Sequence, residues 1–186
     1  MGKVIENKFP ILETDRLVLR EITPEDAENI FTYLSDKEVM KYYGLAPFQS
    51  VDEALDEIAW YQSIRENNTG IRWGITLKGK GEVIGSCGFL NIVSQHFRSD
   101  IGFELSKDYW GQGIAQESIE AVIKYGFEQL NLQRIQALIE PPNEASQKLV
   151  ERQGFIKEGL LRNYEFTSGK FDDLYMYSLL KEDFEK

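Results

Sequence analysis

The spacing of apolar and polar residues predicts strands and helices in mixed order along the chain. Residues 16–21 alternate in polarity as a β-strand does. A helix is then expected to begin near residue 23. Thr23 can cap it, Pro24 suits its first turn, and Asp26 interacts favourably with the helix dipole. Residues 50–53 read Ser-Val-Asp-Glu, a capping box that predicts a second helix. The apolar stripe of this second helix consists of Val51, Leu55, Ile58 and Tyr61.

The rest of the chain predicts a sheet with two further helices. We expect strands at residues 71–77, 82–90, 101–105, 134–140, 155–166 and 171–180. A helix with the apolar residues Ile119, Val122, Ile123, Phe127 and Leu130 precedes the strand at 134–140. A shorter helix at 143–153, ended by Gly154, follows that strand. Turns at 79–81 and 167–170 make two hairpins. This order predicts a single α/β (α+β) domain over residues 1–186, with some parallel strand pairing.

Composition narrows the class of protein. A chain of 186 residues can bury one core. No apolar run approaches the roughly 18–20 residues of a membrane span, and Met1–Pro10 lacks the apolar stretch of a signal peptide. Cys87 is the single cysteine and His96 the single histidine, which excludes an internal disulfide and a zinc-type ligand cluster. We therefore expect a cytoplasmic, metal-free protein without a membrane partner.

The net charge of −10 bears on the choice of partner. An acidic surface repels phosphates, so nucleic acid is a disfavoured ligand. The same charge favours a cationic partner, such as an amine or a basic protein segment. The alternative is that the acidity serves solubility alone.

Residues 110–115 read Trp-Gly-Gln-Gly-Ile-Ala and lie between a predicted strand and a predicted helix. Glycines let the backbone approach a ligand closely, and the free N–H groups of a first helical turn attract phosphate oxygens. A P-loop needs a Gly-Lys-Ser/Thr ending, and a dinucleotide fingerprint needs a small residue where Gln116 stands. Two interpretations remain: a loop that binds the phosphates of an acyl-CoA, or a plain glycine turn before a helix.

The segments around this loop carry a family resemblance. Residues 100–105 (Asp-Ile-Gly-Phe-Glu-Leu) and 109–117 resemble the GNAT N-acetyltransferase superfamily. The branch with the ribosomal-protein alanine and serine N-terminal acetyltransferases is the most similar. That branch resemblance rests on residues 13–20, 83–85, 143–146 and 154–159 and on Arg162, and so covers nearly the whole chain. Trp110 stands where the superfamily usually has Gln or Arg, but an aromatic residue is common there in this branch.

The resemblance implies a mixed, mostly antiparallel seven-stranded sheet with splayed central strands and about four flanking helices. It also implies acetyl-CoA as co-substrate and no metal. The pantetheine arm would lie in the gap between the splayed strands, and residues 112–115 would hold the pyrophosphate. Lys148 and Arg152 either neutralise phosphates or form a solvated helix face. The implied cofactor contacts are Phe103, Glu104, Leu105, Trp110, Gly111, Gln112, Gly113, Ile114, Ala115, Asn143, Ser146 and Lys148.

Acetyl transfer to an amine requires removal of a proton, stabilisation of an oxyanion and departure of a thiolate. By resemblance, Ser146 donates the proton to the thiolate, and Glu165 acts as base on the incoming amine, through water. Asp100 and Glu104 are rival bases. Tyr109 and Tyr164 are candidates to line the amine pocket. We expect Cys87 in the core and His96 in a turn, so that Ser146 lacks an activating histidine and is no nucleophile.

Three functions stay open for the sequence. The first is acetylation of a protein N-terminal α-amine, such as that of a ribosomal protein. The second is acetylation of a small amine, a polyamine or an aminoglycoside, and the third is a non-catalytic CoA-binding module. An α-amine, with a pKa near 7.7–8.0, needs less help from a base than lysine, near 10.4. The resemblance implies that the two early helices, with Tyr42-Tyr43-Gly44 between them, form the acceptor-binding side. It is also compatible with a homodimer. Trp60 and Trp73 are expected in the core.

Overall fold

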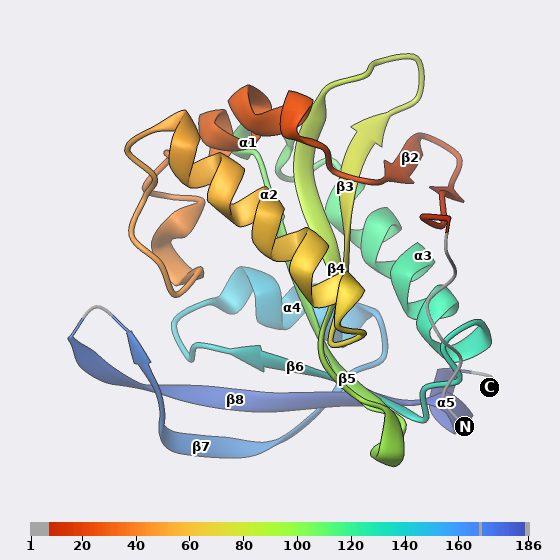
Figure 1. Cartoon of the computed structure of the whole chain (residues 1–186). Helices are drawn as coiled ribbons and strands as arrows, with labels where there is room; N and C mark the ends of the chain where they lie inside the picture. Colours follow the sequence, from red (N-terminus) through yellow and green to blue (C-terminus); the bar gives the residue numbers. More distant parts are fainter. Residues whose placement is uncertain (1–7, 168, 185–186) are drawn as a thin grey trace.

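The structure, a computed structural model, describes residues 8–167 and 169–184 (Figure 1). Most of the Met1–Pro10 segment and part of the turn at 167–170 therefore lie outside the described residues. The first half of the chain contains β1 (Leu12–Glu13), β2 (Leu17–Arg20), α1 (Ala27–Leu34), α2 (Val51–Glu66), β3 (Ile71–Leu77) and β4 (Val83–Val93). The second half contains β5 (Arg98–Leu105), α3 (Ile114–Glu128), β6 (Arg134–Ile139), α4 (Glu144–Arg152), β7 (Ile156–Thr167), β8 (Lys170–Leu180) and α5 (Lys181–Phe184).

The strands form one sheet in the order β1-β2-β3-β4-β5-β6-β8-β7. All neighbouring strands are antiparallel except β5 and β6, which are parallel. The long connection that contains α3 permits this parallel pair, because a parallel crossover needs about a dozen residues or more. The mixed, mostly antiparallel sheet is thus confirmed, with one difference. It has eight strands rather than seven, because Leu12–Glu13 adds a two-residue edge strand beside β2.

The sheet splits at its centre. Residues 98–100 of β5 pair with residues 134–136 of β6, but the rest of each strand has no partner across this junction. Beyond that point β5 continues along β4, and β6 continues along β8. The two halves of the sheet therefore diverge, and the splay that the resemblance implied is confirmed.

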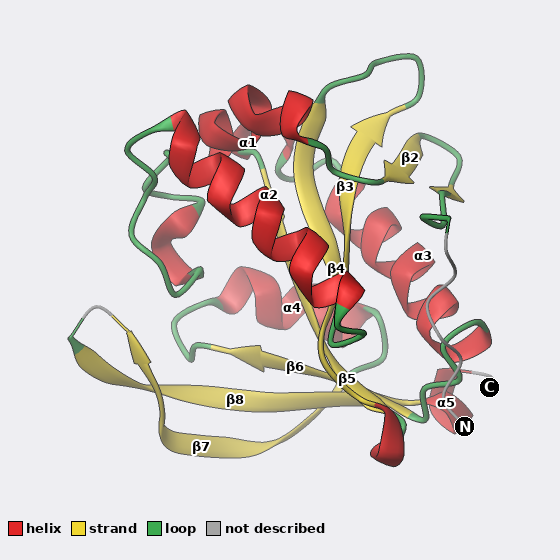
Figure 2. Cartoon of the chain, viewed as in Figure 1, coloured by secondary structure: helices red, strands yellow, loops and turns green. Residues whose placement is uncertain are grey.

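Helices cover both faces of the sheet (Figure 2). One hydrophobic cluster joins α1 and α2 to the sheet through residues such as Ile30, Leu34 and Ile58. A second cluster packs α3 against the opposite face, with Ile119, Val122 and Ile123 fully buried. These three positions recur at helical spacing, so the apolar stripe predicted for α3 is confirmed for them and for Phe127, whereas Leu130 lies beyond the end of α3 and is only partly buried.

Two expectations about the core are wrong on α2. Trp60 has 44% of its surface exposed and Leu55 38%, whereas Ala54 is fully buried. Trp73, Cys87 and Tyr61 are buried as expected. The stripe was misplaced because Ala54, a small residue, takes a fully buried position in the cluster of α1 and α2, which leaves the adjacent Leu55 partly exposed. Trp60 is instead available to a cavity described below.

Candidate active site

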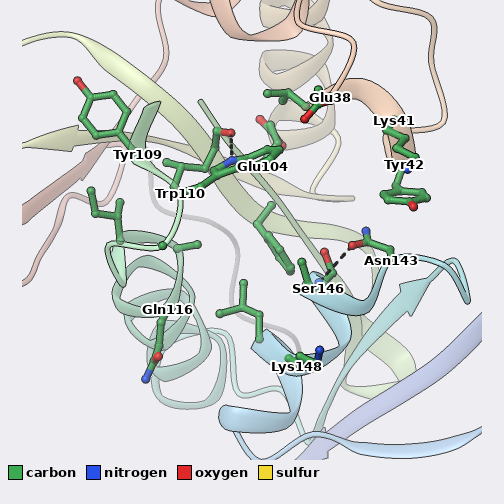
Figure 3. A pocket seen from close by; sticks show the side chains of 18 of the residues that line it. Glu38, Lys41, Tyr42, Glu104, Tyr109, Trp110, Gln116, Asn143, Ser146 and Lys148 are labelled. Atoms are coloured by element: carbon green, nitrogen blue, oxygen red, sulfur yellow. Dashed lines mark hydrogen bonds between the residues drawn. The ribbon is translucent and has the colours of Figure 1, made fainter. Parts of the chain in front are cut away.

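A cavity of about 650 Å³ lies beside the end of β5, beyond the residues where β5 pairs with β6 (Figure 3). Residues 103–105 line it from the end of β5, and residues 113–116 line it from the start of α3. Asn143, Ser146 and Lys148 lie across from them at the start of α4. A third wall comes from the α1–α2 connection, which includes the 3-10 turn Met40–Tyr42.

The loop before α3 is shaped to hold an anion. Gly111 and Gly113 have φ angles of 72° and 76°, a conformation that disfavours residues with a Cβ atom. Gly113 is the N-cap of α3, so the N–H groups of the first turn have no acceptor within the helix. Ile114, Ala115 and Gln116 of that turn line the cavity. The helix dipole adds positive potential there, which suits phosphate oxygens.

Two hydrogen bonds fix the walls of this cavity. The Trp110 indole Nε1 donates to the Leu105 carbonyl over 2.8 Å, which ties the glycine loop to the end of β5. The Asn143 side chain caps α4, because its Oδ1 accepts a hydrogen bond from the Ser146 backbone N–H over 3.2 Å. Ser146 therefore belongs to the first turn of a capped helix and lines the cavity.

A second cavity, of about 660 Å³, continues from the first. Its walls come from the α1–α2 connection, from β5 and β6, and from the β7–β8 hairpin. Tyr164 and Glu165 of β7 are among its lining residues. The residues that line both cavities are Tyr42, Tyr43, Phe103, Glu104, Asn143 and Ser146. A group transferred between ligands in the two cavities would therefore pass beside Ser146.

The second cavity is acidic. Its lining contains five carboxylates, those of Glu57, Asp100, Glu104, Glu140 and Glu165. The one basic side chain among the described lining residues, Arg72, is already paired with Glu104. Burial, followed by the nearby charge of Asp172, raises the pKa of Glu140; Lys170 opposes this shift and Glu165 adds to it. An incoming cation would relieve this repulsion, so the lining favours a positively charged ligand.

Glu104 is held in a buried ion pair at the boundary of the two cavities. Arg72 Nη2 donates to its Oε2, and the Ser86 hydroxyl donates to its Oε1. Arg72 Nε also donates to Ser86 Oγ over 2.8 Å. Burial raises the pKa of Glu104, although Arg72 and Ser86 oppose that shift. Both carboxylate oxygens are engaged, so this side chain supports the site wall.

Asp100 and Glu165 lie in different surroundings. Asp100 is half-buried, where β5 and β6 separate, and its oxygens accept hydrogen bonds from Asn91 (2.8 Å) and Gln136 (2.7 Å). Glu165 is exposed on β7 and approaches the α1–α2 connection near Gly44. Asp100 therefore bridges neighbouring strands through its two hydrogen bonds, whereas the Glu165 carboxylate is exposed to solvent.

Comparison with known proteins identifies the family. The Acetyltransferase (GNAT) domain matches residues 16–156. The chain belongs to the GNAT acetyltransferase family. It is 44% identical to the uncharacterized N-acetyltransferase YoaA of Bacillus subtilis, over 93% of this chain and 98% of the relative. It is 27% identical to the [ribosomal protein uS5]-alanine N-acetyltransferase of Escherichia coli, over 92% and 91% of the two chains.

Solved GNAT structures share the fold. The spermidine N-acetyltransferase of Vibrio cholerae, in complex with CoA and spermine, superposes with a TM-score of 0.80 at 25% identity. The match covers 93% of this chain and all of that one (100%). The present GNAT chain is thus an acetyl-CoA-dependent N-acetyltransferase. No described helix is long and apolar enough to cross a membrane, and residues 8–167 and 169–184 contain no His, Cys, Asp or Glu grouping able to hold a metal ion.

The first cavity of this GNAT domain fits acetyl-CoA. The backbone at the start of α3 would hold the pyrophosphate, and residues 103–105 of β5 lack a partner strand on the side where the pantetheine amides would lie. When bound, acetyl-CoA supplies an activated acetyl thioester. All the predicted cofactor residues line this cavity except Gln112, whose backbone carbonyl points instead to Arg16. Lys148 and Arg152 also line it, and Lys148 pairs with Glu144 at 3.2 Å.

Several residues of the GNAT site were not predicted from the sequence. Arg72, Glu57 and Glu140 line the second cavity, and Tyr43 donates a hydrogen bond to Glu57 over 2.7 Å. An arginine within a strand of apolar residues carries no sign that its guanidinium is buried. Glu57 and Glu140 belong to segments far apart in the chain, so only the fold places them in one lining.

Proposed function

We propose that this enzyme transfers acetyl groups to the N-terminal α-amine of a protein, in the cytoplasm. The observation that carries the proposal is the acidic cavity, which meets the acetyl-CoA cavity at Asn143 and Ser146. An α-amine enters such a cavity as a cation and needs only modest help to lose its proton. The E. coli relative that acts on an alanine of ribosomal protein uS5 supports this class of acceptor.

Direct attack by the amine is the mechanism that the lining supports. His96 is exposed in the 3-10 turn Ser94–His96, and neither His96 nor the buried Cys87 lines either cavity. Without an adjacent base, the Ser146 hydroxyl is a poor nucleophile. The acetyl group would therefore move to the amine in one transfer, with no acyl group on the protein.

In this proposal two side chains move protons. Glu165 accepts a proton from the bound ammonium through water, which leaves a neutral amine to form the new C–N bond. The nitrogen becomes cationic as this bond forms and releases its second proton to water, which gives the neutral amide. As the C–S bond breaks, the Ser146 hydroxyl donates its proton to the departing sulfur and recovers one from solvent. Tyr164 lies next to Glu165 in the lining and would contact the acceptor.

A small polyamine is the second candidate acceptor. The four carboxylates other than Glu104, which is paired with Arg72, suit a molecule with several ammonium groups, and the Vibrio cholerae neighbour was solved with spermine. A protein N-terminus is distinguished from a polyamine by its lower α-amine pKa, so it loses its proton with less help from a base.

A thiol-release assay across acceptors tests the proposed function. The panel contains peptides with free N-terminal Ala or Ser followed by a basic residue, the same peptides with blocked N-termini, spermidine, and an aminoglycoside. We expect the highest kcat/KM with free peptides and none with blocked ones. Turnover of spermidine or the aminoglycoside alone would refute the protein acceptor, and CoA binding without turnover of any amine would indicate a non-catalytic module.

The choice of base is tested by pH profiles of two variants. We expect Glu165→Gln to lower kcat/KM for a free peptide about tenfold at pH 6.5. The deficit should shrink above about pH 8, because the α-amine then loses its proton without help. Asp100→Asn is the matched control and should leave the shape of the profile unchanged. A profile altered only by Asp100→Asn would assign the base to Asp100 instead.

A further inference from the structure

The segment before β2 contacts the loop before α3, although about 100 residues of chain separate them. Arg16 Nε donates to Glu117 Oε2 over 2.6 Å, and the Arg16 backbone N–H donates to Glu117 Oε1 over 2.9 Å. The Thr14 hydroxyl donates to the same Oε1 over 2.5 Å and accepts from the Leu17 N–H over 3.0 Å. The Glu117 carboxylate thus holds the Arg16 guanidinium in one orientation.

The same guanidinium reaches the glycine loop. Arg16 Nη1 donates to the Gln112 backbone carbonyl over 2.9 Å. A Cβ atom added to Gly113 would lie 3.4 Å from Arg16 Nη2, so this nitrogen is next to the N-cap of α3. The Gln112 side chain donates to the Asp108 carbonyl over 2.9 Å, which fixes the other side of the residue. The peptide between Gln112 and Gly113 is therefore held with its carbonyl oxygen turned toward Arg16.

This orientation matters for an anion. A carbonyl oxygen that faced the phosphate oxygens would repel them, whereas the N–H groups that follow it attract them. Glu117 itself is a carboxylate in the first turn of α3, the turn whose residues 114–116 line the cofactor cavity. Burial alone would raise the pKa of Glu117, but hydrogen bonds from Thr14 and Arg16 lower it, so the carboxylate is ionised. Arg16 compensates this negative charge.

We propose that Arg16 is a positioning residue for the pyrophosphate of acetyl-CoA. It holds the Gln112 carbonyl away from the phosphates and neutralises Glu117 beside them. Glu117 and Thr14 in turn orient Arg16. The proposal concerns the cofactor cavity and is independent of which amine is the acceptor.

Calorimetry with CoA tests this assignment directly. We expect Arg16→Ala to weaken CoA binding about tenfold, the effect of losing charge-assisted hydrogen bonds. Arg65→Ala is the matched control, because Arg65 also forms a partly exposed ion pair, with Glu21 at 3.0 Å, but lies in the last turn of α2 rather than beside the glycine loop. Unchanged CoA affinity in Arg16→Ala would overturn the proposal.

A donor without the pyrophosphate separates positioning from a general structural role. Arg16→Ala should raise the KM for acetyl-CoA with little change in kcat, and should leave kcat/KM for S-acetylpantetheine unchanged. Equal losses with both donors would show that the substitution damages the whole site and would overturn the proposal. If Arg16→Ala fails to fold, Arg16→Lys replaces it, with a smaller weakening for CoA and again none for S-acetylpantetheine.

Glu117→Ala completes the experiment. Because Glu117 acts by orienting Arg16, the double variant Arg16→Ala/Glu117→Ala should bind CoA no more weakly than Arg16→Ala alone. Multiplicative losses in the double variant would show that the two residues act independently, against the proposed arrangement.

Discussion

Replacing Ser146 by alanine is expected to lower the kcat of acetyl transfer about 100-fold, the usual contribution of a positioned general acid. The Kd for CoA should change little, because the Asn143 side chain holds the Ser146 backbone N–H rather than its hydroxyl. The position of α4 should therefore survive the substitution. Single-turnover kinetics with acetyl-CoA and a free peptide would measure the loss at the chemical step.

Ser146→Thr is the matched variant, since it keeps a hydroxyl at the same place on α4. It should retain much more activity than Ser146→Ala. If Ser146→Ala turned over at the wild-type rate, Ser146 would be a lining residue without a role in proton transfer, and water would protonate the sulfur. If instead CoA affinity fell together with kcat, the side chain would serve binding.

Replacing Arg72 by methionine is expected to reduce the free energy of unfolding by about 3–5 kcal/mol, the cost of leaving a buried charge without its partner. Arg72 and Glu104 are 5% and 6% exposed, so water cannot take the place of the guanidinium. Urea unfolding at fixed pH measures the loss. The double variant Arg72→Met/Glu104→Leu should recover much of the stability, because it removes both charges from the same place.

The pH dependence gives this prediction a second readout. Without Arg72, burial raises the pKa of Glu104 still further above its unfolded value near 4.3. A carboxyl group with a raised folded pKa favours the folded state at low pH, and this contribution is lost as the pH increases. The deficit of Arg72→Met should therefore be larger at pH 8 than at pH 5. A deficit independent of pH, or a double variant as unstable as the sum of the single changes, would contradict the buried pair.

Local sequence patterns were sufficient for most elements. The predicted strand at 71–77 coincides with β3, and the helix expected at about 143–153 is α4, Glu144–Arg152. Periodic apolar residues and turn glycines report such elements because they depend on neighbours close in the chain. Leu55 was misplaced because helical spacing alone does not tell which of two adjacent positions faces the core. Trp60 was misplaced because its residue type alone does not decide whether an aromatic side chain is buried.

The sequence by itself predicted a phosphate-binding loop with glycines at 111 and 113, and its family resemblance predicted roles for Asn143 and Ser146, because motifs with fixed spacing carry them. Only the tertiary structure decided what surrounds these motifs. In the folded chain Arg72 forms an ion pair with Glu104, and Arg16 contacts Gln112 and Glu117. Five carboxylates line one cavity. The physical reason is that charge interactions depend on distance in space, and a splayed sheet brings together side chains that lie up to about 100 residues apart in the chain.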